Sequence, residues 1–159
     1  MFIDRISTAL ASSLSIALIL GGALAATAAP AQATDIGWRQ STVLERESAG
    51  AYIRRGTATF KAGEVATVVV NGTNGPPERK GRLPFKARAV YEFKDGSAIT
   101  IRFVGSRDPA SSAQIGTGMF LNGTGRFRGI IGKFTFTGRP GLGEVGETDW
   151  VGSYSVSKK

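Results

Sequence analysis

The chain has 159 residues, a net charge of +8 from 20 Lys and Arg against 12 Asp and Glu, and neither Cys nor His. Without thiols or imidazoles, a disulfide framework, a Cys/His zinc site, a cysteine nucleophile and a histidine-based triad are all excluded. The 22 Gly, with Val, Phe and Thr spread along the chain, favour strands over helices. We therefore expect a single β-domain with no cofactor and no metal.

The N-terminal segment has the anatomy of a secretory signal peptide. Residues 6–34 carry no charge, Leu14–Leu24 is strongly apolar, and the small residues that follow end in Ala31-Gln32-Ala33. An uncleaved membrane anchor is the alternative, because the uncharged stretch is long enough to span a bilayer. We expect residues 1–33 to be cleaved off, which leaves a basic domain at residues 34–159. That domain is expected to be secreted or periplasmic, without stable membrane insertion after cleavage.

From Ile36 onward the chain lacks helical periodicity and contains segments with the period of two that is typical of strands. Strands are expected at Trp38–Glu47, Tyr52–Lys61, Glu64–Asn71, Phe85–Phe93, Ile99–Val104, Gln114–Leu121, Lys133–Thr137 and Trp150–Ser157. Loops are expected at Asn71–Arg82 and Gly138–Glu147, and a turn at Asn122-Gly123. Eight strands with mostly short connections fit a closed antiparallel meander barrel, whose interior is filled or holds one small ligand.

One hairpin is predicted most directly. Apolar residues occupy alternate positions on both sides of an Asp95-Gly96 turn, namely Phe85, Ala87, Ala89, Tyr91 and Phe93 before it and Ile99, Ile101 and Phe103 after it. Alternate side chains of a strand share one face, so this apolar face is expected to point into the barrel. Its members Tyr91, Phe93, Ile101 and Phe103 are candidates to bind a ligand there.

The segment Ile115–Gly132 (IGTGMFLNGTGRFRGIIG) contains the near-repeat GTGMF and GTGRF. A phosphate-binding loop is excluded, because no Gly-Lys-Ser/Thr follows and no strand leads into a helix. Glycine at alternate positions of a strand instead indicates a tightly curved barrel wall, which another backbone can approach closely. Phe120 and Phe127 are then expected to fill interior space and to join the ligand-binding residues.

Gly123–Gly132 (GTGRFRGIIG) resembles the G-x-G-x-F-x-G-x-x-G signature of allene oxide cyclases and dirigent-like barrels. Lys80–Phe85, the strand that ends in Tyr91-Glu92-Phe93 and the Asp95-Gly96 turn follow the same order as the cyclase pattern, so the resemblance covers Lys80–Thr137. It implies an all-β, eight-stranded antiparallel calycin-like barrel with an apolar interior, often trimeric in plant relatives. Such barrels serve stereocontrolled cyclisation or coupling of reactive hydrophobic intermediates.

Three functions are compatible with such a barrel. The first, which we expect because no catalytic constellation is visible, is binding of a small hydrophobic ligand in the cavity. The second is an isomerase or cyclase that holds a reactive conformer, with Glu45 or Glu92 as acid/base partners. The third is a structural envelope protein with a filled barrel. The plant cyclases carry a glutamate on the first strand, for which Glu45 and Glu47 are the nearby candidates, and a cavity cysteine without counterpart here.

A second constellation is basic: Arg79, Lys80, Arg82, Lys86 and Arg88 lie close together in the chain. Nucleic acid or another acidic polymer is one partner that such a segment could bind through counterion release. Recognition of a single strand requires aromatic residues between the charges, and Phe85 alone does not provide them. A solvated basic face is the simpler interpretation, and we expect no specific nucleic-acid partner.

Overall fold

The computed structural model describes residues 32–78, 81–140 and 145–157. The expected signal peptide lies outside the described residues except for Gln32 and Ala33, and so do Arg79 and Lys80 of the basic segment. The elements in chain order are β1 (Thr34–Ser48), β2 (Ala51–Phe60), β3 (Val65–Asn74), β4 (Leu83–Phe93), β5 (Ala98–Arg107), β6 (Gln114–Gly123), the 3-10 helix η1 (Gly125–Phe127), β7 (Ile130–Pro140) and β8 (Val145–Val156).

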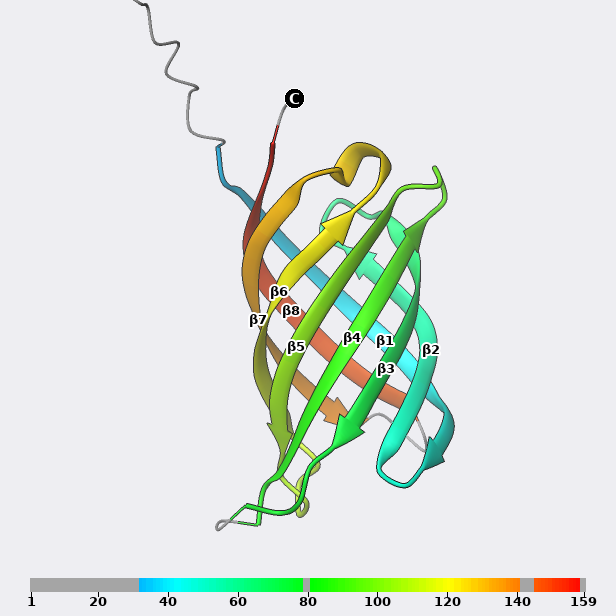
Figure 1. Cartoon of the computed structure of the whole chain (residues 1–159), viewed down its shortest axis with the longest axis vertical. Coiled ribbons are helices and arrows are strands. Elements are labelled where there is room, and N and C mark those ends of the chain that lie inside the picture. Colours follow the sequence, from blue (N-terminus) through cyan, green and yellow to red (C-terminus); the bar gives the residue numbers. More distant parts are fainter. Residues whose placement is uncertain (1–31, 79–80, 141–144, 158–159) are drawn as a thin grey trace, which may run out of the picture.

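Each strand pairs antiparallel with the next one in the chain, and β8 pairs with β1, so the sheet closes into a barrel (Figure 1). Each of the eight described strands therefore has a hydrogen-bonded neighbour on both sides, which suits a chain that has no cysteine to cross-link it. The expected all-β, eight-stranded antiparallel barrel is confirmed.

The predicted hairpin is β4 and β5. Tyr91 pairs with Ile99 and Ala89 pairs with Ile101, and all four side chains are buried. The Ser97 carbonyl accepts a hydrogen bond from the Phe93 N–H at 2.9 Å, and Gly96 adopts a φ of 79°. The Asp-Gly turn therefore works as expected, because glycine takes the left-handed conformation without strain.

Three expected connections are in fact partly strand. Asn71–Asn74 continue β3 and pair with β4, Asn122-Gly123 continue β6 and pair with β5, and the loop expected at Gly138–Glu147 begins and ends inside β7 and β8. Residues 141–144 of that loop lie outside the described residues. The reason for these differences is geometric, because tilted strands must be long to close an eight-stranded barrel and their ladder hydrogen bonds override local turn propensity.

The glycine-rich segment divides into two parts. Gly116 and Gly118 lie on β6, where a Cβ would collide with the rings of Phe136 and Phe134 from β7, so these glycines make room for aromatic side chains. Gly125 was expected on the same curved wall, but it is the first residue of η1 and has a φ of 56°. A Cβ at Gly125 would meet the Ser97 hydroxyl, so this glycine serves a turn and a close approach rather than strand curvature.

Aromatic rings fill the middle of the barrel. The rings of Trp38 and Trp150 are stacked with centroids 5.3 Å apart, and the rings of Phe134 and Phe103 each meet that of Trp150 edge to face at 5.3 and 5.0 Å. Around them lie buried aliphatic residues such as Val68, which is 1% exposed. Edge-to-face and offset ring contacts stabilise a core beyond the burial of apolar area.

The two ends of the barrel differ. At one end, the upper end in Figure 1, η1 folds over the opening and buries Phe127 against Phe93, with ring centroids 4.9 Å apart. The guanidinium of Arg126 lies over both rings and forms a salt bridge with Glu64 at 2.7 Å. No comparable plug is present at the other end in the part of the chain that the structure describes, and the interior there is partly polar.

Candidate functional site

The unplugged end of the barrel contains a cavity of about 230 Å³, which we call the mouth cavity. It lies near the β1–β2 turn, at the lower end in Figure 1. Its apolar floor is formed by Val70, Phe85, Phe103 and Trp150, and its wall by polar residues that include Gln40, Thr42, Tyr52, Arg54, Arg107 and Thr148. An apolar surface with a few convergent polar groups is typical of small-molecule sites.

Strand alternation explains this composition. On β2, Ala58 and Phe60 are buried at the plugged end, and the same face of the strand continues through Gly56 to Arg54 and Tyr52 at the mouth. On β1 the buried face likewise changes from Trp38 to the polar Gln40 and Thr42. Side chains two positions apart on a strand point to the same side. The inward faces of β1 and β2 therefore change from apolar at the plugged end to polar at the mouth.

Arg54 is anchored at the cavity wall. Its Nε donates a hydrogen bond to Thr42 Oγ1 at 3.1 Å, and one of its terminal nitrogens donates to the Thr42 carbonyl oxygen at 2.9 Å. A Cβ at Gly146 would lie 3.0 Å from the Arg54 guanidinium, so the absence of a side chain there makes room for that group. The positive charge is thus fixed inside the rim of the barrel.

Tyr52 and Arg107 lie on the same wall. The Tyr52 ring occupies the space above Gly72, where any Cβ would collide with it. Burial raises the pKa of Tyr52 to about 12, while the charges of Arg54 and Arg107 act in the opposite direction and that of Glu47 adds to the rise. Tyr52 is therefore a neutral hydrogen-bond donor at neutral pH, and it lies within the field of two arginines.

A buried hydrogen-bond chain supports the floor of the mouth cavity. Trp38 Nε1 donates to Tyr91 Oη at 3.2 Å, and Tyr91 Oη donates to Gln40 Oε1 at 2.7 Å. Burial raises the pKa of Tyr91 above its ordinary value, so this phenol stays protonated. Trp150 Nε1 differs from these groups, because it is buried and has no hydrogen-bond partner among the described residues.

The structure separates the residues expected to bind a ligand. Of these, Phe103 lines the mouth cavity. The other five pack within the aromatic and aliphatic core away from that cavity: Tyr91, Phe93, Ile101, Phe120 and Phe127. Tyr91 contributes indirectly, because its hydroxyl holds the side chain of Gln40.

The two glutamates expected as acid/base partners lie on the outside of the barrel. Glu45 is skipped by the β1–β2 pairing at a bulge and forms an exposed salt bridge with Arg55. Glu92 is exposed on β4. Neither lines the mouth cavity, whereas Glu47, two residues after Glu45, does, and its Oε1 accepts a hydrogen bond from Asn74 Nδ2 at 3.3 Å.

Sequence reasoning missed Tyr52, Arg54 and Arg107 as site residues. The signal in the sequence is their position in the alternation of each strand. Each residue falls on the inward-facing positions of its strand and places a polar group where an apolar one is expected. That signal is weak at a strand end, where polar residues are common on either face.

The described residues contain no group of three or more acidic, Cys or His side chains arranged to hold a metal ion. Nor do they contain a helix long and apolar enough to cross a membrane.

Comparison of the chain with protein-family models, with curated proteins and with solved structures gave no match.

Proposed function

We propose that this protein binds a small amphipathic anion, such as an acyl carboxylate, in the mouth cavity. The observation that carries the proposal is the composition of that cavity: Arg54, Arg107 and Tyr52 line its wall, above a floor of Phe85, Phe103 and Trp150. A carboxylate would accept hydrogen bonds from the arginine and tyrosine side chains, and an apolar body would lie on the aromatic floor.

The size of the cavity limits the ligand. At about 230 Å³ it is smaller than sites for drug-sized ligands, which measure roughly 300–1,000 Å³. The packed aromatic core below prevents a long apolar chain from threading through the barrel. A short or medium acyl chain with one charged end fits these limits best.

This proposal refines the expectation of a small hydrophobic ligand. Burying an anion requires a paired charge. Arg107 provides it at the partly polar end of the interior, where Arg54 adds a second positive charge and Glu47 is the acidic residue among those that line the cavity. The resemblance to allene oxide cyclases and dirigent-like barrels is retained as a proposal, supported by the closed meander of eight strands. A cyclase activity finds less support, because Glu45 and Glu92 lie on the outer surface.

Calorimetric titration with octanoate and with octanol tests the proposal, since the two ligands share an acyl chain and differ in charge. Octanoate is expected to bind the barrel at residues 34–159 more tightly than octanol does. Arg107→Gln should weaken octanoate binding by about tenfold or more, the range of one charged hydrogen bond, and leave octanol binding nearly unchanged. Arg128→Gln, which removes an exposed charge away from the mouth cavity, serves as the matched control.

Equal binding of octanoate and octanol, or equal effects of the two substitutions, would contradict the proposal. Absence of binding by either ligand would favour the filled structural barrel instead.

A further inference from the structure

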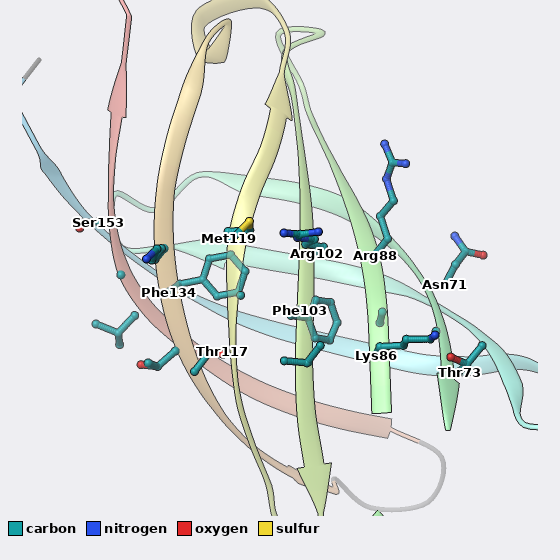
Figure 2. A pocket seen from close by; sticks show the side chains of 18 of the residues that line it. Asn71, Thr73, Lys86, Arg88, Arg102, Phe103, Thr117, Met119, Phe134 and Ser153 are labelled. Carbon is teal, nitrogen blue, oxygen red and sulfur yellow. The ribbon is translucent and has the colours of Figure 1, made fainter. Parts of the chain in front are cut away.

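The outer surface of the barrel has a second hollow, separate from the mouth cavity. It measures about 1210 Å³ and lies over β3 to β8 and the first residues of β1, on the outside of the sheet. Figure 2 shows side chains that line it, including Lys86 and Arg88 on β4, Arg102 on β5 and Met119 on β6. We call this surface the basic wall and define it by Lys86, Arg88, Arg102, Val104, Lys133 and Val151.

The cations of the basic wall lie side by side without acidic partners. Arg88 and Arg102 are directly opposite each other in the β4–β5 register, and Lys133 is opposite Met119, the neighbour of Arg102 on β6. Within the described ranges, Lys86, Arg88, Arg102 and Lys133 form no ion pair, and Asp35 is the one acidic residue that lines the hollow. Like charges directly opposite each other destabilise a sheet, so folding does not account for this arrangement.

A row of apolar and small residues runs beside the cations. Val104 is opposite Thr117, Thr117 is opposite Thr135, and Thr135 is opposite Val151, so the row crosses four adjacent strands. Val104 and Val151 are each 57% exposed, which is high for valine on a sheet. The wall therefore offers positive charge and exposed apolar area together.

This combination distinguishes among possible partners. A second copy of the chain, with a net charge of +8, would bring like charges together at this face. A single nucleic-acid strand stacks its bases on aromatic side chains, whereas the exposed large apolar residues among those described are Val, Ile and Leu. An anionic lipid leaflet satisfies both features, since it offers phosphates to Lys and Arg and an apolar interface to valine.

We propose that the basic wall docks on the surface of a lipid leaflet rich in anionic phospholipid. Headgroup phosphates would bind Lys86, Arg88, Arg102 and Lys133, while Val104 and Val151 enter the interface beside them. The barrel stays folded and peripheral, with the mouth cavity at its end rather than on the docked wall.

Vesicle flotation with residues 34–159 tests this proposal, because that segment contains every strand of the closed barrel and omits the apolar N-terminal stretch. The barrel should float with vesicles of phosphatidylcholine mixed with phosphatidylglycerol and remain unbound with phosphatidylcholine alone. The double variant Arg88→Gln/Arg102→Gln should weaken binding about 25-fold, since each cation near an anionic surface strengthens it about fivefold. Val104→Thr/Val151→Thr should weaken it roughly tenfold.

Arg46→Gln/Arg128→Gln is the matched control, because both side chains are exposed, neither lines the hollow, and the net charge changes by the same amount. It should bind the anionic vesicles nearly as the unsubstituted barrel does. Thermal melts confirm folding, and Arg88→Gln/Arg102→Gln should melt at the same temperature or higher because the like-charge pair is gone.

Equal losses of vesicle binding in Arg88→Gln/Arg102→Gln and in Arg46→Gln/Arg128→Gln would overturn the proposal, since net charge rather than the basic wall would then drive binding. It would also be overturned by failure to float with anionic vesicles. Tight binding of a single-stranded oligonucleotide without vesicle binding would assign the wall to nucleic acid, and self-association through Val104 and Val151 would assign it to a second copy.

Discussion

The indole rings of Trp38 and Trp150 stack at the centre of the barrel, with centroids 5.3 Å apart and planes 4° apart. Both side chains are buried, yet their N–H groups differ: Trp38 Nε1 donates to Tyr91 Oη, and Trp150 Nε1 has no partner among the described residues. The stack thus joins a hydrogen-bonded core residue to one that lines the mouth cavity.

Two matched substitutions exploit this difference. Trp38→Phe and Trp150→Phe remove similar volume, but only the first removes a hydrogen bond. We expect Trp38→Phe to lower the free energy of unfolding by about 1 kcal/mol more than Trp150→Phe does. Denaturant unfolding of both variants measures the difference, and a loss at Trp150 that equals or exceeds the loss at Trp38 would contradict this assignment.

Gly125 and Gly63 form a second matched pair. Both have positive φ, 56° and 81°, but a Cβ at Gly125 would meet Ser97, whereas none of the described atoms outside the adjacent residues lies within 4 Å of a Cβ at Gly63. Gly63→Ala should cost only the left-handed strain of about 1–2 kcal/mol. Gly125→Ala should cost more, since η1 must also move away from Ser97. Thermal denaturation compares them, and equal losses would show that the contact with Ser97 is unimportant.

Tyr52 should titrate at high pH. Because burial raises its pKa to about 12, the folded state disfavours the phenolate. The contribution of protonated Tyr52 to the free energy of unfolding is therefore fully present below the ordinary tyrosine pKa of about 10. It is lost as the pH rises toward 12. The difference in ultraviolet absorbance between the unsubstituted barrel and Tyr52→Phe should give a midpoint near 12. A midpoint near 10 would place Tyr52 in solvent rather than in the wall of the cavity.

Asp95 should titrate in the acid range. The Ser97 backbone N–H donates to its carboxylate at 2.9 Å and, with the Ser97 hydroxyl and the charge of Arg126, lowers the Asp95 pKa. This contribution to stability is present above the unfolded pKa of about 3.9 and is lost as the pH falls through the folded value. Asp95→Asn should therefore be less stable than the parent at neutral pH and approach it in acid. A difference in the free energy of unfolding between Asp95→Asn and the parent that stays constant from neutral to acid pH would contradict this contribution of the Asp95 carboxylate.

The sequence predicts the barrel better than it predicts the site. Alternation from Phe85 to Phe103 and the Asp95-Gly96 turn are local signals, so the β4–β5 hairpin could be predicted from them. That Arg54 and Arg107 point into the barrel depends on where β2 and β5 end, and those ends are set by closure of the whole barrel rather than by neighbouring residues. The same dependence explains Asn122-Gly123, whose turn propensity is overridden by pairing with β5.

Quenching of tryptophan fluorescence by bromine carried on octanoate tests whether an acyl carboxylate binds in the mouth cavity. The chain has two tryptophans, of which Trp150 lines the mouth cavity and Trp38 stacks against it. With the carboxylate at Arg107 and the acyl chain on the aromatic floor, ω-bromo-octanoate should quench strongly and α-bromo-octanoate weakly at equal saturation. Quenching should also require higher ligand concentrations in Arg107→Gln. Equal quenching by the two isomers, or calorimetric binding without quenching, would place the ligand outside the mouth cavity and contradict the proposed function.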